Sequence, residues 1–396
     1  MLNILKINWP GIGTKFTKFE IKKINDVILK ADTYSMGKYL IEFENNFKKY
    51  HKIEFCVGLS SCTAALEIAA LLSNLNKGDE VIVPAHTFSA SAIPFARTGA
   101  KLVFADIDQE TFLVSLKTIS TKLTDKTKAV IIPHLYGLMA PVREIFEYIK
   151  KINKNILIIE DCAQSIGAEA NSLLAGTIGD FACYSFHSQK NINSLGEGGM
   201  LVVKNKKIFE ATLRLRKIGS RPFKNQKNYW QPAMSNILQA IPGIWPYNFA
   251  LSEIQAFAGN IMFSRLDEII EKRTQNAEEI KKKLINIECL KFQKIPVNYK
   301  HSYHLLPFRV NYEKKINRND IIKILFYNYG IKCAVQYMPL YRYDLFKKFG
   351  YINRTCIESD KFFDNMISIP FWTEMKKSDI KYITNSIEKT ILQLRR

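Results

Sequence analysis

Short apolar runs that alternate with amphipathic segments constrain the fold of this chain more than any other feature. The runs are rich in valine and isoleucine and are typical of strands, at 55–59, 80–84, 101–106, 129–133, 156–160, 181–186 and 200–203. Apolar residues at helical spacing follow several of them, at 63–75, 89–97, 141–150 and 208–218. Because the runs are continuous, both faces of the sheet are expected to be buried. The pattern predicts an α/β fold with a mostly parallel central sheet flanked by helices.

The rest of the sequence divides the chain into two predicted domains, 1–250 and 251–396. The first domain contains the sheet and ends in an irregular loop, 220–248, which is rich in proline and aromatic residues. A proline-free amphipathic pattern then predicts one long connecting helix at 252–284. Beyond this helix, strands alternate with helices and predict a smaller C-terminal α+β domain. These elements are the strands 305–310 and 332–336 and the helices 320–329 and 377–394.

The charge of the chain favours anionic partners, since 57 Lys and Arg outnumber 37 Asp and Glu and give a formal net charge of +20. No nucleic-acid-binding signature accompanies this charge, and neither a long apolar run nor a signal peptide is evident. The seven cysteines form no CxxC pair, and the six histidines lack metal-ligand spacing. We therefore expect a cytoplasmic protein with reduced thiols, without a metal, a nucleic-acid partner or a membrane segment.

A lysine stands in a polar loop between the apolar run 181–186 and the glycine-rich segment 196–199. A lysine at such a strand–loop junction can be shielded from water, which lowers the pKa of its amine and makes the amine nucleophilic. Most lysines in so basic a chain are solvated surface charges, however. The position of Lys190 gains meaning only from the residues that accompany it elsewhere.

Three strand-to-helix junctions carry suitable partners. Ser61, Cys62 and Thr63 stand where a helix begins, and the N–H groups of a helix N-terminus bind phosphate. Asp161 ends a buried strand, where a carboxylate needs a cation, and Phe88 is in position to stack on a flat ring. Each residue also has an ordinary interpretation, as a helix cap or a core aromatic. Together with the lysine they form the set that pyridoxal phosphate requires.

In order and in approximate spacing, these motifs resemble those of the DegT/StrS family of pyridoxal phosphate-dependent sugar aminotransferases. The most specific are Glu160-Asp161-x-Ala163-Gln164, Gly176-x-x-Gly179-Asp180, Ser185-Phe186-x-x-x-Lys190-Asn191 and Gly196-Glu197-Gly198-Gly199. The resemblance spans about 37–338, nearly the whole chain. It implies the fold-type I aminotransferase architecture.

By this resemblance, Lys190 forms the Schiff base with the cofactor and moves the proton, while Asp161 keeps the pyridine nitrogen protonated. Gln164 bonds the ring oxygen and Phe88 stacks on the ring. A homodimer with shared sites is expected, in which the cofactor phosphate binds residues of both chains. The residues from the same chain are Ser61, Cys62, Thr63 and Ser185, and the residue from the partner chain is Asn248.

The chain departs from the family pattern at three places. Cys62 stands where the phosphate motif usually has glycine, and Ala250 stands where an arginine often follows the asparagine that matches Asn248. The segment 220–248 is also longer than the usual loop. These departures bear on the cofactor phosphate and on the shape of the substrate pocket.

The resemblance implies a ping-pong transfer of an amino group from L-glutamate to a keto-sugar, most often nucleotide-linked, in surface-glycan or related amino-sugar biosynthesis. His134, His187, His304 and Tyr337 are candidate sugar contacts, and a structural role is an equal interpretation for each. Lys190 argues against a dehydratase relative that carries histidine at this position. Two alternatives remain: amination of a non-nucleotide ketone, such as a small phosphorylated ketone or a cyclitol, and a non-catalytic regulator that retains the fold.

Overall fold

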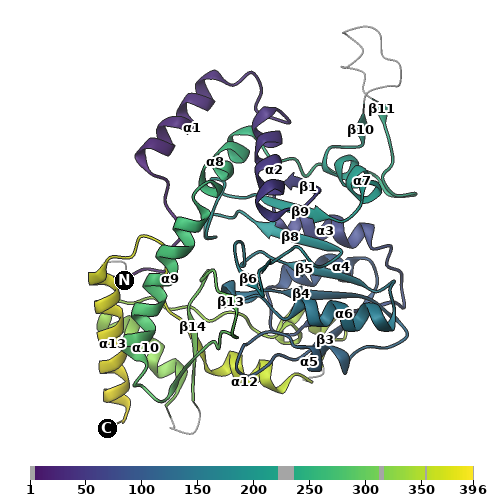
Figure 1. The fold of residues 1–396 in the computed structure, drawn as a ribbon. Helices are drawn as coiled ribbons and strands as arrows, with labels where there is room; N and C mark the ends of the chain where they lie inside the picture. The colour runs from purple at the N-terminus through teal and green to yellow at the C-terminus, as the bar shows by residue number, and fades with distance from the viewer. Residues whose placement is uncertain (1–4, 222–235, 312–315, 353–354, 396) are drawn as a thin grey trace.

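A seven-stranded sheet forms the centre of the computed structural model, which describes residues 5–221, 236–311, 316–352 and 355–395 (Figure 1). In spatial order its strands are β1 (Phe55–Leu59), β9 (Gly199–Val203), β8 (Phe181–Ser185), β5 (Leu157–Asp161), β4 (Thr127–Pro133), β2 (Glu80–Pro84) and β3 (Lys101–Ala105). Strands β3, β2, β4, β5 and β8 are parallel, whereas β9 is antiparallel to both of its neighbours. The prediction of a mostly parallel central sheet is confirmed.

Both faces of this sheet are buried, because successive residues of one strand pack in different apolar clusters. In β2, Val81 and Val83 pack in one cluster and Ile82 packs in the other. The first cluster includes apolar residues of α3 (Cys62–Leu72), α4 (Ile93–Arg97) and α7 (Lys206–Arg216). The second includes those of α2 (Lys38–His51), α5 (Leu116–Ser120), α6 (Val142–Ile152) and α8 (Glu253–Phe263). The continuous Val/Ile runs therefore follow from two-sided burial.

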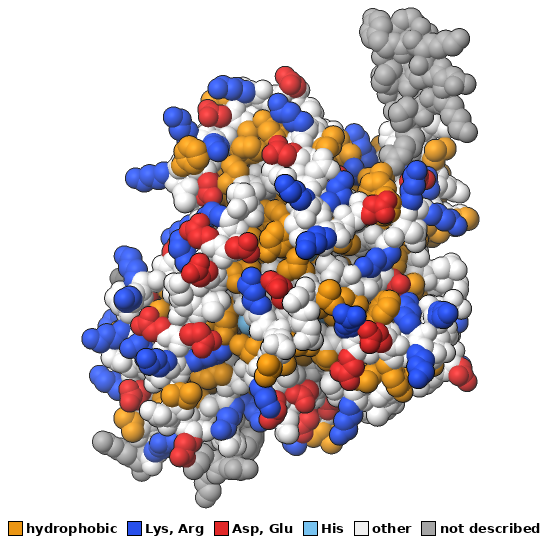
Figure 2. All heavy atoms as spheres, viewed as in Figure 1, with side chains coloured by type: hydrophobic (Ala, Val, Ile, Leu, Met, Phe, Trp, Pro, Cys, Tyr) orange, Lys and Arg blue, Asp and Glu red, His pale blue; other side chains and the backbone are white. Residues whose placement is uncertain are grey.

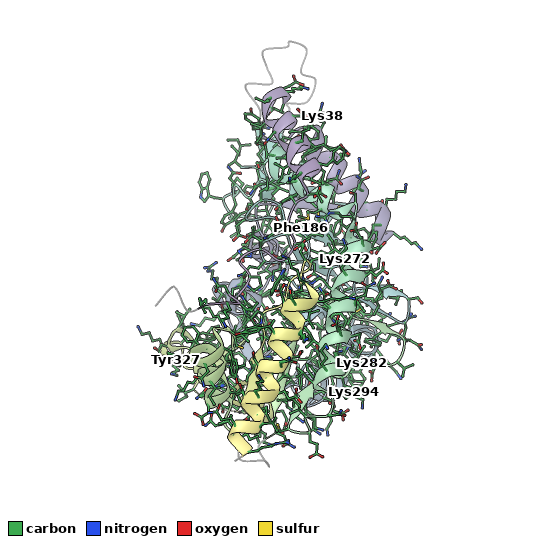
Figure 3. All side chains as sticks on the ribbon, turned by 90° about the vertical axis from the view of Figure 1, so that its left-hand side faces the viewer. Lys38, Phe186, Lys272, Lys282, Lys294 and Tyr327 are labelled. Carbon is green, nitrogen blue, oxygen red and sulfur yellow. The ribbon has the colours of Figure 1, made fainter. Side chains whose placement is uncertain are left out.

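A third apolar cluster lies in the C-terminal part of the chain, around an antiparallel sheet of order β12-β14-β15. Its elements are α9 (Leu266–Leu284), β12 (Leu290–Phe292), β14 (Pro307–Val310), α10 (Arg318–Tyr329), β15 (Met366–Ser368) and α13 (Lys377–Arg395). Helices α9 and α13 lie side by side along this part (Figures 1 and 3). The remaining elements are α1 (Lys18–Lys30), β6 (Glu169–Ala170), β7 (Leu173–Leu174), β10 (Ser220–Arg221), β11 (Asn236–Ile237), β13 (Tyr299–Lys300), α11 (Asp344–Lys348) and α12 (Ile357–Asn365).

The prediction of one continuous helix at 252–284 is wrong. Helix α8 ends at Phe263 and α9 begins at Leu266, because Arg265 leaves helical geometry with φ −117° and ψ 25°. The Arg265 guanidinium bonds Glu20 at 2.7 Å and the Lys15 carbonyl at 2.8 Å. The break coincides with contacts to residues about 250 positions away, and neither proline nor glycine marks it in the sequence.

Two smaller predictions also require correction. The predicted strand at 332–336 does not form, because this segment makes only an isolated bridge between Ala334 and Ser368. The predicted helix at 89–97 divides into a 3₁₀ turn, Ser89–Ser91, and α4. Pro94 lies in the first turn of α4, where its missing N–H leaves no hydrogen bond unmade.

The predicted irregular loop at 220–248 is described only at its ends, because residues 222–235 lie outside the described part. Its ends pair as the short antiparallel strands β10 and β11. In the described part of the chain, no helix has the length and hydropathy needed to cross a membrane.

Candidate active site

A cavity of about 340 Å³ lies where several parallel strands reach their carboxyl ends. Its walls come from the residues that follow β2 and β4, from the ends of β5 and β8, and from the N-terminus of α3. The segment that contains Gln336 and Tyr337 forms a further wall. Open α/β sheets bind ligands at this edge, because the strand ends bring polar loops together there.

The cavity brings together most of the residues that the sequence singles out. The predicted cofactor and substrate residues in its lining are Ser61, Cys62, Thr63, Phe88, His134, Asp161, Gln164, Ser185, His187, Lys190 and Tyr337. Asn248 and His304 are not part of the lining. Among the polar lining residues that sequence reasoning missed are Ser91, Glu197 and Gln336. Ser91 and Glu197 lie within recognised motifs, whereas no spacing signal marks Gln336.

Lys190 is half-buried in the loop after β8, and its N–H donates to the His187 carbonyl at 2.8 Å. Burial lowers the pKa of its amine, and the neighbouring Cys62 and the carboxylates of Asp161 and Glu197 oppose part of this shift. A lowered pKa increases the neutral, nucleophilic fraction of the amine near neutral pH. The chemical expectation from the strand–loop junction therefore agrees with the surroundings of the side chain.

Asp161 is 7 % exposed and ends β5. Its carboxylate accepts hydrogen bonds from Ser91 Oγ at 2.7 Å and from the Ala163 N–H at 3.0 Å, and Cys62 Sγ lies 4.0 Å away. Among the described residues, no lysine or arginine forms an ion pair with it. A buried carboxylate with two neutral donors and an open side can pair with a protonated ring nitrogen.

The amide of Gln164 has a fixed orientation. Its Oε1 accepts the Tyr136 N–H at 2.7 Å, and its Nε2 therefore donates to the hydroxyl of Tyr337 at 2.9 Å. The donor atom of the amide, Nε2, is thus on the side of the cavity, where Tyr337 also lies. The ring of Tyr337 in turn lies edge-on to Phe88, with centroids 5.6 Å apart.

The first turn of α3 provides an anion site. Ser61 is the N-cap, and its Oγ accepts the Ala64 N–H at 3.0 Å. The N–H groups of Cys62 and Thr63 have no acceptor within the described chain, as is usual for the first turn of a helix. Strand β9 packs tightly behind this turn, because a Cβ on Gly199 would lie 2.4 Å from the Ser61 carbonyl oxygen. With an amine, a buried acid, an amide donor and free N–H groups in one cavity, these residues fit pyridoxal phosphate.

Three predicted residues have surroundings that the sequence did not reveal. His134 lines the cavity, but its Nε2 bonds Glu160 at 2.9 Å and its Nδ1 accepts the Ala140 N–H at 3.0 Å. His304 is buried, 5 % exposed, and lies outside the lining. Asn248 is exposed, and its side-chain oxygen accepts the Ala250 N–H at 3.3 Å.

His134, Glu160 and Cys162 place three potential metal-ligand atoms within 4.8 Å of one another. Both nitrogens of His134 and both oxygens of Glu160 already take part in hydrogen bonds, the latter with three N–H groups of the loop 176–179. The cluster therefore acts as a structural network beneath the cavity.

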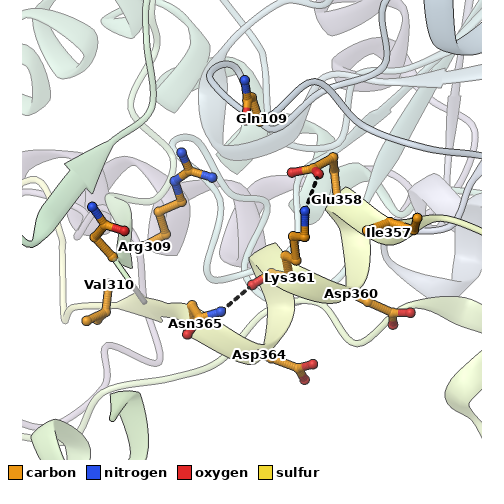
Figure 4. Close-up of a pocket in the computed structure, with 10 residues that line it drawn as sticks. Gln109, Arg309, Val310, Ile357, Glu358, Asp360, Lys361, Asp364 and Asn365 are labelled. Carbon is orange, nitrogen blue, oxygen red and sulfur yellow. Dashed lines mark hydrogen bonds and ion pairs between the residues drawn. The ribbon is translucent and has the colours of Figure 1, made fainter. Parts of the chain in front are cut away.

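A larger groove of about 600 Å³ lies beside α12 (Figure 4). Its acidic side chains are already paired: Glu358 with Lys361 at 2.9 Å, and both Asp360 and Asp364 with Arg342. Without a shielded amine or an unpaired buried acid, this groove lacks the chemical groups of the smaller cavity.

Comparison with known proteins gives concordant results. A profile described as the DegT/DnrJ/EryC1/StrS aminotransferase family matches residues 15–388. The chain is 29 % identical to the GDP-perosamine synthase of Escherichia coli O157:H7, covering 84 % of this chain and 86 % of that protein. It is 30 % identical to the UDP-N-acetyl-3-dehydro-alpha-D-glucosamine 3-aminotransferase of Acidithiobacillus ferrooxidans, covering 85 % and 84 %. The structure of a putative sugar aminotransferase, Spr1654 of Streptococcus pneumoniae, in its PMP form superimposes with a TM-score of 0.86, at 25 % identity, over 98 % of this chain and 100 % of that one.

Proposed function

We propose, from the premise that this chain belongs to the DegT/DnrJ/EryC1/StrS aminotransferase family, that it transfers an amino group from L-glutamate to a nucleotide-linked keto-sugar. Pyridoxal phosphate is the cofactor. The observation that carries the proposal is the meeting of the Lys190 amine, the buried Asp161 carboxylate and the N-terminus of α3 in one cavity. The relatives named for GDP- and UDP-linked sugars support the substrate class.

Each residue of the cavity has a distinct task in this proposal. When bound, pyridoxal phosphate supplies an electron sink for the substrate carbon that bears the nitrogen. Lys190 holds the cofactor covalently and moves the proton at that carbon, which requires a neutral amine close to the reacting atoms. Asp161 pairs with the protonated ring nitrogen, and Gln164 donates from Nε2 to the ring oxygen. Phe88 stacks on the ring.

The anion site at α3 holds the cofactor phosphate through main-chain N–H groups, with Ser61, Thr63 and Ser185 beside them. Cys62 leaves this site intact, because its contribution is an N–H group that any residue other than proline provides. The departure from glycine at this position therefore changes the space near Asp161 rather than the number of donors.

The two alternatives receive less support. A non-catalytic regulator has no need for a shielded lysine beside a buried carboxylate, and that pair is costly to retain. An uncharged ketone such as a cyclitol ketone would leave unexplained the surplus of basic residues, which suits a diphosphate-bearing substrate. Reduced cysteines and an intermediate linked to a nucleotide are both consistent with a reaction in the cytoplasm.

The test begins with purified protein loaded with pyridoxal phosphate. The loaded protein is expected to show a visible absorbance band that borohydride abolishes. L-glutamate is expected to remove this band and to release one 2-oxoglutarate per site. Keto-sugars linked to GDP, UDP and dTDP are then screened for return of the band. Return only with free phosphorylated ketones or cyclitol ketones would contradict the nucleotide-sugar proposal, and no reaction with any amino donor would favour a regulator.

We also propose a homodimer with shared sites, in which Asn248 reaches the cofactor phosphate of the partner. Hydrophobic side chains gather in a band over the region of α1, α2 and α8 on the face shown in Figure 2. In α1 and α2, Phe19, Leu29 and Ile41 are 66, 79 and 58 % exposed. Apolar surface of this extent is typical of a subunit interface. The exposure of Asn248 outside its own cavity is consistent with a role in the partner.

Mixed dimers test this arrangement. Lys190→Ala and Asn248→Ala chains are expected to be weakly active alone and to regain activity when unfolded together and refolded. The reason is that one site of the hybrid would combine an intact Lys190 with an intact Asn248 from the other chain. Activity is measured as 2-oxoglutarate release at equal total protein. If Asn248 acted within its own chain, no hybrid site would be intact and mixing would restore nothing.

A further inference from the structure

Arg273 is a fully buried cation in α9, and within the described part of the chain no carboxylate forms an ion pair with it. Its guanidinium instead donates to the carbonyls of Tyr303 at 2.6 Å, His304 at 2.7 Å and Gly13 at 3.0 Å, and to Thr373 Oγ1 at 2.9 Å. Burial lowers its pKa to about 9, so the group remains charged at neutral pH. A buried charge of this kind is costly, and its hydrogen bonds tie together three segments that are remote in sequence.

The first of these segments is residues 10–14, here called the N-terminal strap. It lies against residues 187–194, the lysine loop that carries Lys190. The Gly13 N–H donates to the Ser188 carbonyl at 2.9 Å, and Thr14 Oγ1 donates to the Asn191 carbonyl at 2.6 Å. The side chain of Asn193 returns a bond to the Thr14 carbonyl at 2.9 Å. The Gln189 side chain also donates to the Pro10 carbonyl at 3.3 Å, so four hydrogen bonds join the strap to the lysine loop.

The contact between the strap and the lysine loop leaves no spare room. A Cβ added to Gly13 would lie 2.4 Å from the carbonyl oxygens of both Gln189 and Lys190. These are backbone atoms and cannot rotate away. Any side chain at position 13 would have to displace the backbone of Lys190 itself.

The second segment supports the loop from another direction. The Asn191 side chain donates to the Ser302 carbonyl at 2.6 Å, and the carbonyls of the next two residues, Tyr303 and His304, are those that Arg273 binds. The Ser302 N–H donates to the Gly137 carbonyl at 2.8 Å, which attaches this segment to the turn after β4. Arg273 therefore holds both the strap and the segment 302–304, and each of these holds the lysine loop.

We propose that Arg273 is a positioning residue for Lys190, acting through the N-terminal strap and the segment 302–304. The expected effect on the reaction rate rests on the proposed aminotransferase function, whereas the expected effect on the position of the lysine loop does not. Neither Arg273 nor Thr14 lines the cavity, so both act on the place of the Lys190 amine and not on substrate contacts. A displacement of about 1 Å at a reacting group costs up to about 10²-fold in rate.

The test uses Arg273→Lys and Thr14→Val in the full-length chain. The first keeps a charge but loses the forked geometry of the donors. The second removes the hydrogen bonds of Thr14 Oγ1 to the Asn191 carbonyl and to Thr373 Oγ1 while preserving the shape of the side chain. Lys272→Met is the matched control, since Lys272 (Figure 3) is the preceding residue of α9, is exposed, and pairs with Glu268 at 2.5 Å. The first readout is hydrogen exchange without cofactor, at the amides of Gly13 and Ser302 and at that of Ser194, which donates to Phe186.

We expect faster exchange at these amides in both variants and unchanged exchange in Lys272→Met. With pyridoxal phosphate bound, the half-reaction with glutamate is measured as the loss of the visible band. Its rate is expected to fall by about 10- to 100-fold in both variants. Its half-saturating glutamate concentration should stay that of the wild type, because the cavity lining is unchanged. A merely structural role for Arg273 would lower thermal stability without slowing the half-reaction.

Wild-type exchange and a wild-type half-reaction in both variants would overturn the inference. If the wild type itself formed no visible band and did not react with glutamate, the proposed function would fail instead. The exchange measurement would still decide whether Arg273 holds the lysine loop. Gly13→Ala provides a second route to the same question, because its new methyl group would press directly on the lysine loop; wild-type behaviour of this variant would equally count against the proposal.

Discussion

Replacing Lys190 with alanine is expected to lower the rate of amino transfer by about 10⁴-fold, the upper range for loss of a positioned acid–base group. The variant would lose both the covalent attachment of the cofactor and the proton transfer at the substrate carbon. Within the cavity lining, Lys190 is the only lysine, so no second amine is in place to substitute for it. The measurement is 2-oxoglutarate release from L-glutamate in single-turnover mixtures, together with the absence of a borohydride-sensitive visible band.

Lys204→Ala is the matched control for this experiment. Lys204 lies just beyond β9, burial also lowers the pKa of its amine, and its Nζ donates to the Thr177 carbonyl at 2.6 Å. It is not part of the cavity lining, so its loss is expected to leave the visible band and the rate unchanged. Full activity in Lys190→Ala would contradict the assignment of the reacting amine, and with it the proposed chemistry.

Replacing Asp161 with asparagine is expected to lower the rate by about 10³-fold. The amide has nearly the shape of the carboxylate but carries no charge, so it cannot keep a proton on the ring nitrogen. Burial makes this loss larger than it would be at the surface, because Coulomb interactions are stronger where water is excluded. The rate of the glutamate half-reaction and the affinity for pyridoxal phosphate, measured by equilibrium dialysis, would both be determined.

Ser91→Ala provides the graded comparison. It removes one hydrogen-bond donor to Asp161, at 2.7 Å, and leaves the charge in place. Its effect is therefore expected to be smaller than that of Asp161→Asn, in the same direction. A Ser91→Ala variant as slow as Asp161→Asn would show that orientation of the carboxylate, rather than its charge, carries the effect. A wild-type rate in Asp161→Asn would remove Asp161 from the mechanism.

The sequence predicted the central sheet and most of the site because both depend on local pattern. Continuous Val/Ile runs can be buried only on both faces of a sheet, and the paired clusters around Val81 and Ile82 confirm that burial. Parallel strands end at one edge, so residues just after separate runs, such as Asp161 and Lys190, were expected to meet. The cavity lining places them together.

The wrong predictions share a cause that no local pattern reveals. The helix break at Arg265 coincides with bonds to Glu20 and Lys15, which lie near the opposite end of the chain. The segment 332–336 has strand-like composition, but it meets its neighbours at single bridges rather than along a ladder. His134 stays a candidate for substrate contact, and its hydrogen bond to Glu160, which no local pattern predicts either, depends on the adjacent placement of β4 and β5.

By itself, the sequence determined the class of fold and the strand ends at which the proposed amine and acid stand. The fold class follows from the periodicity of burial, which acts over a few positions, and the proposed roles of Lys190 and Asp161 follow from the resemblance of their motifs to a known family. Only the tertiary structure decided which groups shield Lys190, how Gln164 is oriented and how the lysine loop is held. Arg273 and Gly13 are 260 positions apart, and their hydrogen bond exists only because folding brings α9 and the N-terminal strap together. Long-range contacts of this kind depend on the packing of the whole chain, and for that reason the position of the reacting amine is a property of the fold.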